Sequence, residues 1–144
     1  MKYLNRLMVS VLLLTPVLAS LTHAEIAVIV SLKNNNSYTS IDKDLVERIF
    51  LSKVKNFPDG TVVKPLNLKQ GHYLRDEFNS GFLSKTESQL SRYWSRLRFS
   101  GKAQLPQEAQ SVDEVKALIA NNPNLIGYID AMDVDDTIKI VHKY

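Results

Sequence analysis

The sequence predicts an α/β fold with a largely parallel sheet that is flanked by helices. Segments apolar enough for buried strands alternate along the chain with segments of helical periodicity, which is typical of parallel sheets covered by helices. In addition, the first candidate strand, residues 25–32, contains a nearly continuous apolar run. Such a run is expected for a strand that is buried on both faces.

The chain begins with a pattern typical of a secretory signal peptide. Two basic residues are followed by an apolar run at 7–18, and small residues precede a cleavage position after Ala24. The alternative is a retained membrane anchor, but this run is shorter than the roughly 20 residues that a membrane-spanning helix needs. We therefore predict a signal peptide at 1–24, export to the periplasm, and one mature domain at 25–144 without a transmembrane segment.

Composition excludes several classes of function. The 144 residues contain no cysteine, which excludes disulfides, thiolate nucleophiles and cysteine-ligated metals. Two of the 18 basic residues lie in the predicted signal peptide, so the mature domain is nearly neutral against its 15 acidic residues. This balance gives no support to a nucleic-acid partner.

The first half of the mature chain predicts a strand, a helix and a second strand. The polar, Asn-rich segment 33–40 predicts a loop after the first strand. Asp42 is a suitable N-cap for a helix that ends at residue 51, and apolar residues recur along it at helical spacing. The sequence Asn-Phe-Pro-Asp-Gly at 56–60 predicts a turn before the second strand at 61–68.

Two helices are predicted next. A sharp turn at 70–72 opens the first of them. Thr86 opens the second with a capping-box pattern, in which Thr is followed three residues later by Gln. The residues predicted to be buried are Leu74, Phe78 and Phe82 in the first helix and Leu90, Tyr93, Trp94 and Leu97 in the second.

The last third of the chain predicts a loop, a helix and two strands. The loop covers residues 101–110. A second capping-box pattern begins at Ser111, and its helix ends at the Asn-Asn-Pro sequence 121–123. Apolar residues at 125–129 and 137–141 predict the last strands. No repeat or linker divides the chain, so one domain is expected.

The sequence offers no catalytic or metal-binding pattern. The mature chain has neither histidine spacing for a metal, nor a Gly-x-Ser-x-Gly nucleophile motif, nor a Gly-rich phosphate loop of the nucleotide-binding type. A late acidic cluster lacks the Gly and terminal Glu of a calcium loop and is interpreted as a solvated turn; it consists of Asp130, Asp133, Asp135 and Asp136. We therefore predict no enzyme activity, no cofactor and no metal site.

A positively charged strip lies along the helix that is predicted to begin after Thr86, and it continues into the loop beyond this helix. Its two interpretations are an exposed helix face and a docking surface for an anionic partner or a membrane. The strip consists of Arg92, Arg96, Arg98 and Lys102.

The turn that joins the second strand to the next helix is the candidate binding site. A helix N-terminus presents free backbone N–H groups and the positive end of the helix dipole, so it can receive an anion. Gly71 lets the backbone approach a ligand closely, although an ordinary strand-to-helix connection is the alternative. The predicted ligand-binding residues are Lys69, Gln70, Gly71, His72, Tyr73 and Arg75.

Several short motifs, taken in order, resemble the phosphate-binding protein of phosphate ABC transporters, which has the type II periplasmic binding protein fold. Ile-Phe-Leu-Ser-Lys ends the segment 41–53, the turn 56–60 follows, and Ile-Gly-Tyr occupies 126–128. Residues 71–78 correspond to the Gly-Ser-Gly-Thr-Arg turn of the family. The chain is similar to the short, single-lobe proteins of this type, which also carry segments like 93–97 and 99–102.

The resemblance implies a domain like one lobe of such a binding protein. It implies that the domain binds phosphate or another small oxyanion without catalysis, and that a transporter component is a partner. However, Leu68 stands where the family has an arginine, and the residues after Gly71 replace its Ser-Gly-Thr, while Arg75 is retained. The lost arginine removes a two-point clamp for an oxyanion. The alternative function is an envelope protein–protein interaction module that has kept the fold without the ligand.

Overall fold

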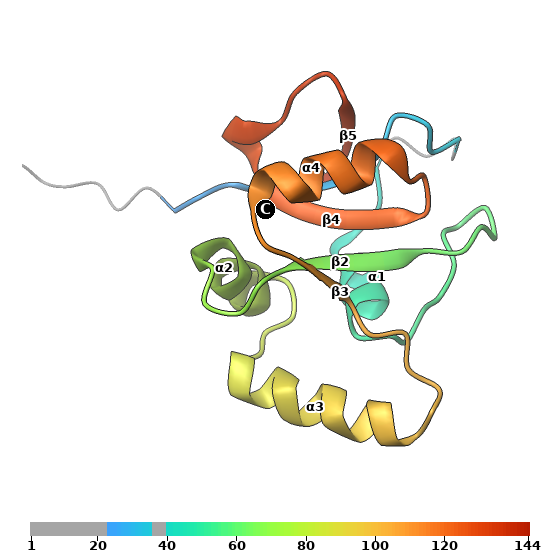
Figure 1. Ribbon diagram of the computed structural model, residues 1–144, viewed down its shortest axis with the longest axis vertical. Helices are drawn as coiled ribbons and strands as arrows, with labels where there is room; N and C mark the ends of the chain where they lie inside the picture. Colours follow the sequence, from blue (N-terminus) through green and yellow to red (C-terminus); the bar gives the residue numbers. More distant parts are fainter. Residues whose placement is uncertain (1–22, 36–39) are drawn as a thin grey trace, which may run out of the picture.

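The computed structural model describes residues 23–35 and 40–144 (Figure 1). Residues 1–22 of the predicted signal peptide lie outside this part, so export and cleavage after Ala24 stay predictions. The strands are β1 (Ile26–Ser31), β2 (Lys64–Leu68), β3 (Gln107–Ala109), β4 (Leu125–Asp130) and β5 (Ile138–Lys143). The helices are α1 (Lys43–Phe50), α2 (Tyr73–Gly81), α3 (Glu87–Phe99) and α4 (Val112–Asn121), with a short 3-10 helix, η1 (Ala131–Asp133), after β4.

In the described part of the chain, the strands form a five-stranded sheet in the order β3-β2-β4-β1-β5. β2 runs parallel to β3 and to β4, whereas β1 is antiparallel to its neighbours β4 and β5. Four strands therefore share one direction and β1 opposes them. The predicted α/β class is confirmed, and the sheet is mixed because β1 lies between β4 and β5.

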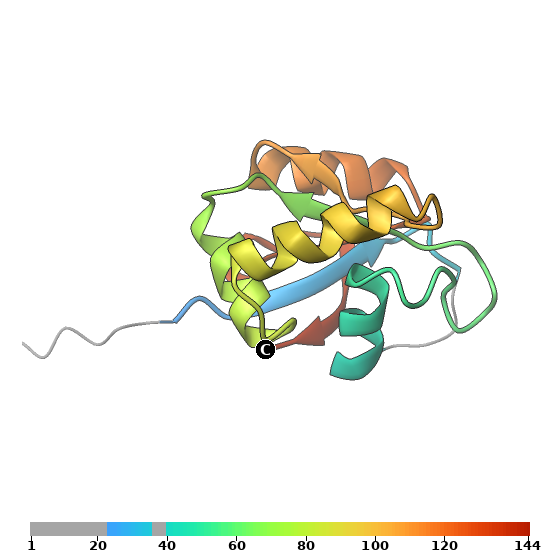
Figure 2. The ribbon, with the colours of Figure 1, turned by 90° about the horizontal axis from the view of Figure 1, so that it is seen from below.

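Helices cover both faces of this sheet, and two successive residues of β4 show which helix covers which face. Gly127 lies under α4, where an added Cβ atom would come within 2.7 Å of Cδ1 of Ile119. Tyr128 points to the opposite face, because side chains alternate along a strand. Its ring packs against Phe50 of α1 and Phe78 of α2. Figure 2 shows α4 on one side of the sheet and α1 on the other.

An aromatic cluster fills the space between the sheet and the helices α1 and α2. The ring centroids of Phe78 lie 4.6 Å from Phe50, 3.9 Å from Tyr128 and 4.9 Å from Phe82. All of these rings are buried, and burying one such side chain contributes about 1.5–3 kcal/mol to stability. The predicted apolar face of α2 is thereby confirmed, as is the prediction that the first strand is buried on both faces.

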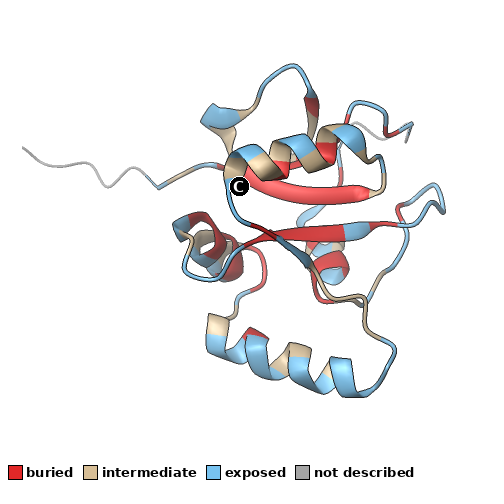
Figure 3. Ribbon diagram, viewed as in Figure 1, coloured by how far each residue is buried: buried red, intermediate tan, exposed pale blue. Residues whose placement is uncertain are grey.

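Helix α3 begins as predicted but is less buried than predicted. Its capping box is complete: Thr86 Oγ1 accepts from the backbone N–H of Gln89 at 3.2 Å, and Gln89 Oε1 accepts from the backbone N–H of Thr86 at 2.9 Å. Leu90 is the buried residue of this 13-residue helix, whereas Tyr93, Trp94 and Leu97 are half-buried. Most of α3 is therefore surface, as Figure 3 shows.

Three sequence-based expectations are corrected by the structure. The predicted loop 101–110 contains the edge strand β3, which pairs with β2. The second strand begins at Lys64 rather than at residue 61. The second capping box is half formed, since Ser111 Oγ accepts from the N–H of Glu114 at 3.2 Å while the Glu114 carboxylate accepts from Gln110 instead.

No helix of residues 23–35 and 40–144 combines the length and apolar character that crossing a lipid bilayer requires.

Candidate functional site

The predicted site residues lie together in the connection between β2 and α2 and in the first turn of α2. The backbone N–H of Lys69 donates to the carbonyl of Ala109 at 2.9 Å, which fixes the end of β2 against β3. Gly71 then has a φ of +87°, a conformation that glycine adopts without the cost that a Cβ atom brings. The chain reverses here and enters α2 at Tyr73.

His72 caps the helix that follows it. Its Nδ1 atom accepts from the backbone N–H of Leu74 at 3.2 Å, and its carbonyl accepts from the N–H of Arg75 at 2.9 Å. The imidazole also stacks on Tyr73, with ring centroids 5.2 Å apart. Most donors at this helix end are therefore satisfied within the turn, whereas the amides of Gly71 and Tyr73 donate to no other described residue.

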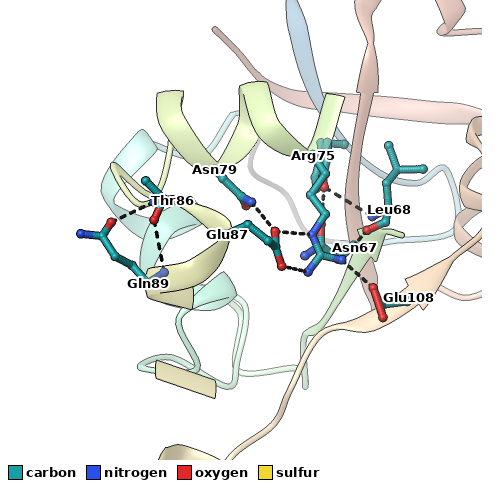
Figure 4. Close-up of polar contacts among 9 residues, drawn as sticks. Asn67, Leu68, Arg75, Asn79, Thr86, Glu87, Gln89 and Glu108 are labelled. Carbon is teal, nitrogen blue, oxygen red and sulfur yellow. Dashed lines mark hydrogen bonds and ion pairs between the residues drawn. The ribbon is translucent and has the colours of Figure 1, made fainter. Parts of the chain in front are cut away.

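Arg75 is held inside the protein by two carboxylates (Figure 4). Its Nε and Nη2 atoms donate to Glu87 at 2.9 and 2.6 Å, and its Nη1 atom donates to Glu108 at 2.5 Å. Nη1 also donates to the carbonyl of Leu68 at 2.8 Å. The residue is only 7% exposed. The charge that the sequence offered to an anion is thus compensated by the protein itself.

The electrostatic balance at Arg75 favours its charged form. Burial alone would lower the pKa of the guanidinium, but hydrogen bonds and charge from Glu87 and Glu108 outweigh burial and raise the pKa above its ordinary value. One cation therefore faces two carboxylates. The cluster as a whole carries no excess of positive charge for a ligand.

Glu87 is positioned by the start of α3 and by a buried amide. It is the first residue of α3, directly after the N-cap Thr86, where the helix dipole favours a negative charge. Asn79 of α2 donates from Nδ2 to Glu87 Oε2 at 2.9 Å. Asn79 Oδ1 is buried without a partner in the described part of the chain. Glu87 therefore joins α3 to α2 through two side chains.

Two buried hydrogen bonds of Tyr128 hold the end of β2, directly before the turn. The hydroxyl of Tyr128 donates to Asn67 Oδ1 and accepts from the backbone N–H of Leu68 at 3.3 Å. Burial raises the pKa of Tyr128, so the hydroxyl stays protonated and remains a donor. The pair connects the end of β2 to β4.

Further carboxylates lie near the turn. Partial burial and the charges of Asp130 and Asp133 raise the pKa of Tyr73, which indicates that these aspartates act on the first residue of α2. Asp130 also accepts from the N–H of Met132 at 2.9 Å and caps η1. These two aspartates therefore add negative charge beside the start of α2.

A polar pocket of about 240 Å³ opens beside the ion pairs of Arg75. Of the predicted site residues, it contains Gln70 and Arg75, while the other four do not line it. The side chains of Trp94 and Arg98 from α3 contribute to its wall. No group of three or more His, Asp or Glu in the described ranges is placed to hold a metal ion.

Sequence reasoning missed Glu87 and Glu108 as partners of Arg75. A signal for Glu87 existed, because Glu87 directly follows the recognised N-cap Thr86 and comes three residues before Leu90, the first residue of this helix that is predicted to be buried. No comparable signal existed for Glu108, because its strand β3 has only three residues and no apolar alternation. Its pairing with Arg75 depends on the contact between β2 and β3.

Several solved structures with the same fold are proteins named for phosphate binding or transport. A candidate phosphate ABC transporter substrate-binding protein of Clostridium perfringens, solved with bound phosphate, matches with a TM-score of 0.61 and 23% identity over 82% of this chain and 45% of its own. An ABC-type phosphate transport receptor of Vibrio cholerae matches with a TM-score of 0.64 and 15% identity, over 83% and 46%. PstS of Borrelia burgdorferi matches with a TM-score of 0.58 and 16% identity, over 82% and 47%.

These similarities concern the fold. No protein-family model matches the chain, and no curated protein matches it in sequence. The chain spans about half the length of the solved proteins that it matches. It therefore has the fold of one lobe of a phosphate ABC transporter substrate-binding protein.

Proposed function

We propose that this domain is a non-catalytic binding module of the cell envelope, and that its partner is a protein surface rather than a free oxyanion. The observation that carries the proposal is the pairing of Arg75 with Glu87 and Glu108. An arginine binds an oxyanion through unpaired N–H groups and an uncompensated charge. Arg75, the retained arginine of the turn, donates four hydrogen bonds to other groups of the protein.

Two features support the envelope location. The predicted signal peptide at 1–24 favours export. The fold is that of a lobe from proteins named for phosphate transport. Periplasmic binding proteins close two lobes on a ligand around a hinge. A lobe of this fold therefore packs against a second protein body, and in this proposal a partner protein takes that place.

Helix α3 supplies surface for such a partner. Leu90 anchors it, whereas Phe99 at its end is 92% exposed. Large exposed aromatic side chains are typical of protein interfaces. The positive residues predicted as a strip lie on the same helix and in the loop after it.

A second candidate function is binding of phosphate or another small oxyanion at the turn before α2, as part of transport. The free amides of Gly71 and Tyr73 favour it. Lys69 is exposed and makes no ion pair with another described residue. This site would lack an arginine clamp, so its affinity would be low.

Two measurements on the mature chain separate these functions. Isothermal titration with inorganic phosphate, with sodium chloride as the control, is expected to give no saturable heat at millimolar concentration. In cells, a photoreactive amino acid in place of Phe99 is expected to give one discrete protein crosslink, whereas the same probe in place of exposed Leu32 gives none. Saturable phosphate binding together with no crosslink from Phe99 would overturn the proposal in favour of the oxyanion function.

A further inference from the structure

A basic groove lies between the end of α1 and helix α3. Its volume is about 350 Å³. Three separate segments bring cations to it: Lys53 follows α1, Lys85 precedes α3, and Arg92 and Arg96 lie one turn apart on α3. The first two are absent from the strip predicted from the sequence; Lys85 precedes the N-cap of α3 directly, whereas only the fold brings Lys53 beside this helix.

The four cations of the groove are uncompensated. None of them forms an ion pair with any residue in the described ranges. Arg92 makes one weak side-chain contact, from Nη1 to Ser88 Oγ at 3.4 Å. Elsewhere, Arg75 is paired with two carboxylates. Because the mature domain is nearly neutral, this concentration of positive charge is local, and a hollow surface focuses its field.

The groove is built on fixed turns. The hydroxyl of Tyr93 donates to the carbonyl of Leu51 at 2.6 Å and ties α3 to the end of α1. Lys53 follows Ser52, which has a φ of 59°, and Lys85 follows Ser84, which has a φ of 49°. These serines are the non-glycine residues with positive φ in the described part of the chain. This conformation is uncommon for a side-chain-bearing residue and marks turns that the surrounding structure holds in place.

We propose that this groove binds an acidic polypeptide segment of the partner protein, an inference that rests on the proposed function. A narrow segment carrying several carboxylates matches cations that converge from three directions on a hollow. A membrane surface fits less well, because it is broad and cannot reach into a hollow. Three apolar residues of α3, Leu90, Tyr93 and Trp94, pack against the core instead of facing a membrane. Phe99 is exposed, but it lies at the end of α3 and does not line the groove.

The test measures binding of a rhodamine-labelled oligoglutamate peptide by fluorescence anisotropy. The groove variant is Arg92→Glu with Arg96→Glu. The matched control is Lys33→Glu with Lys64→Glu, which makes the same change of charge at two exposed lysines that lie outside the groove. The groove variant is expected to bind the peptide at least about tenfold more weakly than the wild type, and the control to bind within about threefold of it, at roughly 0.15 M salt.

Other outcomes overturn the inference. Equal losses in the two double variants would show a general charge effect, and unchanged affinity in the groove variant would remove the groove as the site. Stronger binding to phosphatidylglycerol vesicles than to the peptide would assign the surface to a membrane. Thermal unfolding of each variant verifies that it is folded. If the crosslink from Phe99 persists while the peptide fails to bind, the groove inference fails and the proposed function stands.

Discussion

The guanidinium of Arg75 and the carboxylate of Glu87 form a two-point ion pair with N–O distances of 2.9 and 2.6 Å. The residues are twelve positions apart and belong to different helices. Because α3 buries only Leu90 among its own side chains, this ion pair is a principal attachment of α3 to α2. The same pair removes the charge of Arg75 from the surface, so one contact determines both the packing and the binding properties of the turn.

Replacing Arg75 by methionine is expected to lower the free energy of unfolding by about 3 kcal/mol, because two carboxylates lose their shared cation in a largely buried site. Urea unfolding followed by circular dichroism measures the change. The control is Arg48→Met, which breaks an exposed pair with Asp44 at 3.6 Å and is expected to cost less than about 1 kcal/mol. Equal losses in the two variants would contradict a special role for Arg75.

Replacing Tyr128 by phenylalanine is expected to cost about 1–3 kcal/mol, because Asn67 Oδ1 loses its donor and the Leu68 amide loses its acceptor in the interior. Chemical denaturation provides the measurement. Tyr73→Phe serves as the control, since the Tyr73 ring is exposed and its hydroxyl has no hydrogen-bond partner among the described residues. A loss in the control as large as that in Tyr128→Phe would show that the buried hydroxyl is not responsible.

Alkaline pH is expected to destabilise the domain through Tyr128. Burial raises the pKa of its hydroxyl above the ordinary value of 10.0. The unfolded chain therefore releases this proton at a lower pH than the folded protein, and stability that is fully present below about pH 10 is lost as the pH rises further. Measured between about pH 9 and 11, the loss should be smaller in Tyr128→Phe. Identical pH dependence in the wild type and the variant would contradict the assignment.

The sequence predicted what depends on neighbouring residues. Asp42, Thr86 and Ser111 were recognised as helix starts because capping hydrogen bonds join residues two or three positions apart. The burial of β1 was predicted because a continuous apolar run indicates burial on both faces, whichever elements pack against the strand. Local patterns of this kind fixed the α/β class and most element positions.

Contacts between residues that are distant in the sequence could not be predicted. Arg75 was predicted to bind a ligand, because the sequence does not reveal the pairing of Arg75 with Glu108. Glu108 lies 33 positions away, on a short strand that is joined to β2 by backbone pairing. Tyr93 and Trp94 were predicted to be buried with Leu90, yet α3 packs mainly through its first turns and leaves them half-exposed. The basic groove was likewise not predicted, because Lys53 reaches it from the turn after α1, which is distant from α3 in the sequence.

The close packing of α4 on β4 gives a further prediction. Gly127→Ala is expected to destabilise the domain by about 1–3 kcal/mol, because the new Cβ would lie 2.7 Å from Ile119 Cδ1. Combining it with Ile119→Val removes that Cδ1 atom and should recover part of the loss. Thermal denaturation of the single and double variants forms a double-mutant cycle. Simple additivity of the two single changes would contradict direct contact as the cause.

Removal of the carboxylates around Arg75 should create the anion response that the wild type lacks. In Glu87→Gln with Glu108→Gln, the glutamine side chains keep hydrogen-bond acceptors beside the guanidinium but no longer neutralise it. The polar pocket next to Arg75 then presents an uncompensated cation to solvent. The variant is expected to be less stable than the wild type without phosphate and to gain thermal stability as phosphate is added, because a ligand that binds the folded state raises its unfolding temperature.

The control for this response changes the net charge equally at a distant surface. Asp44→Asn with Asp113→Asn removes two exposed carboxylates and leaves Arg75 paired. Phosphate should not raise the unfolding temperature of this control or of the wild type beyond the effect of sodium chloride at equal ionic strength. If phosphate stabilised the wild type as much as the Glu87→Gln, Glu108→Gln variant, compensation of Arg75 would not be what prevents anion binding. The oxyanion function of the turn would then be the better explanation.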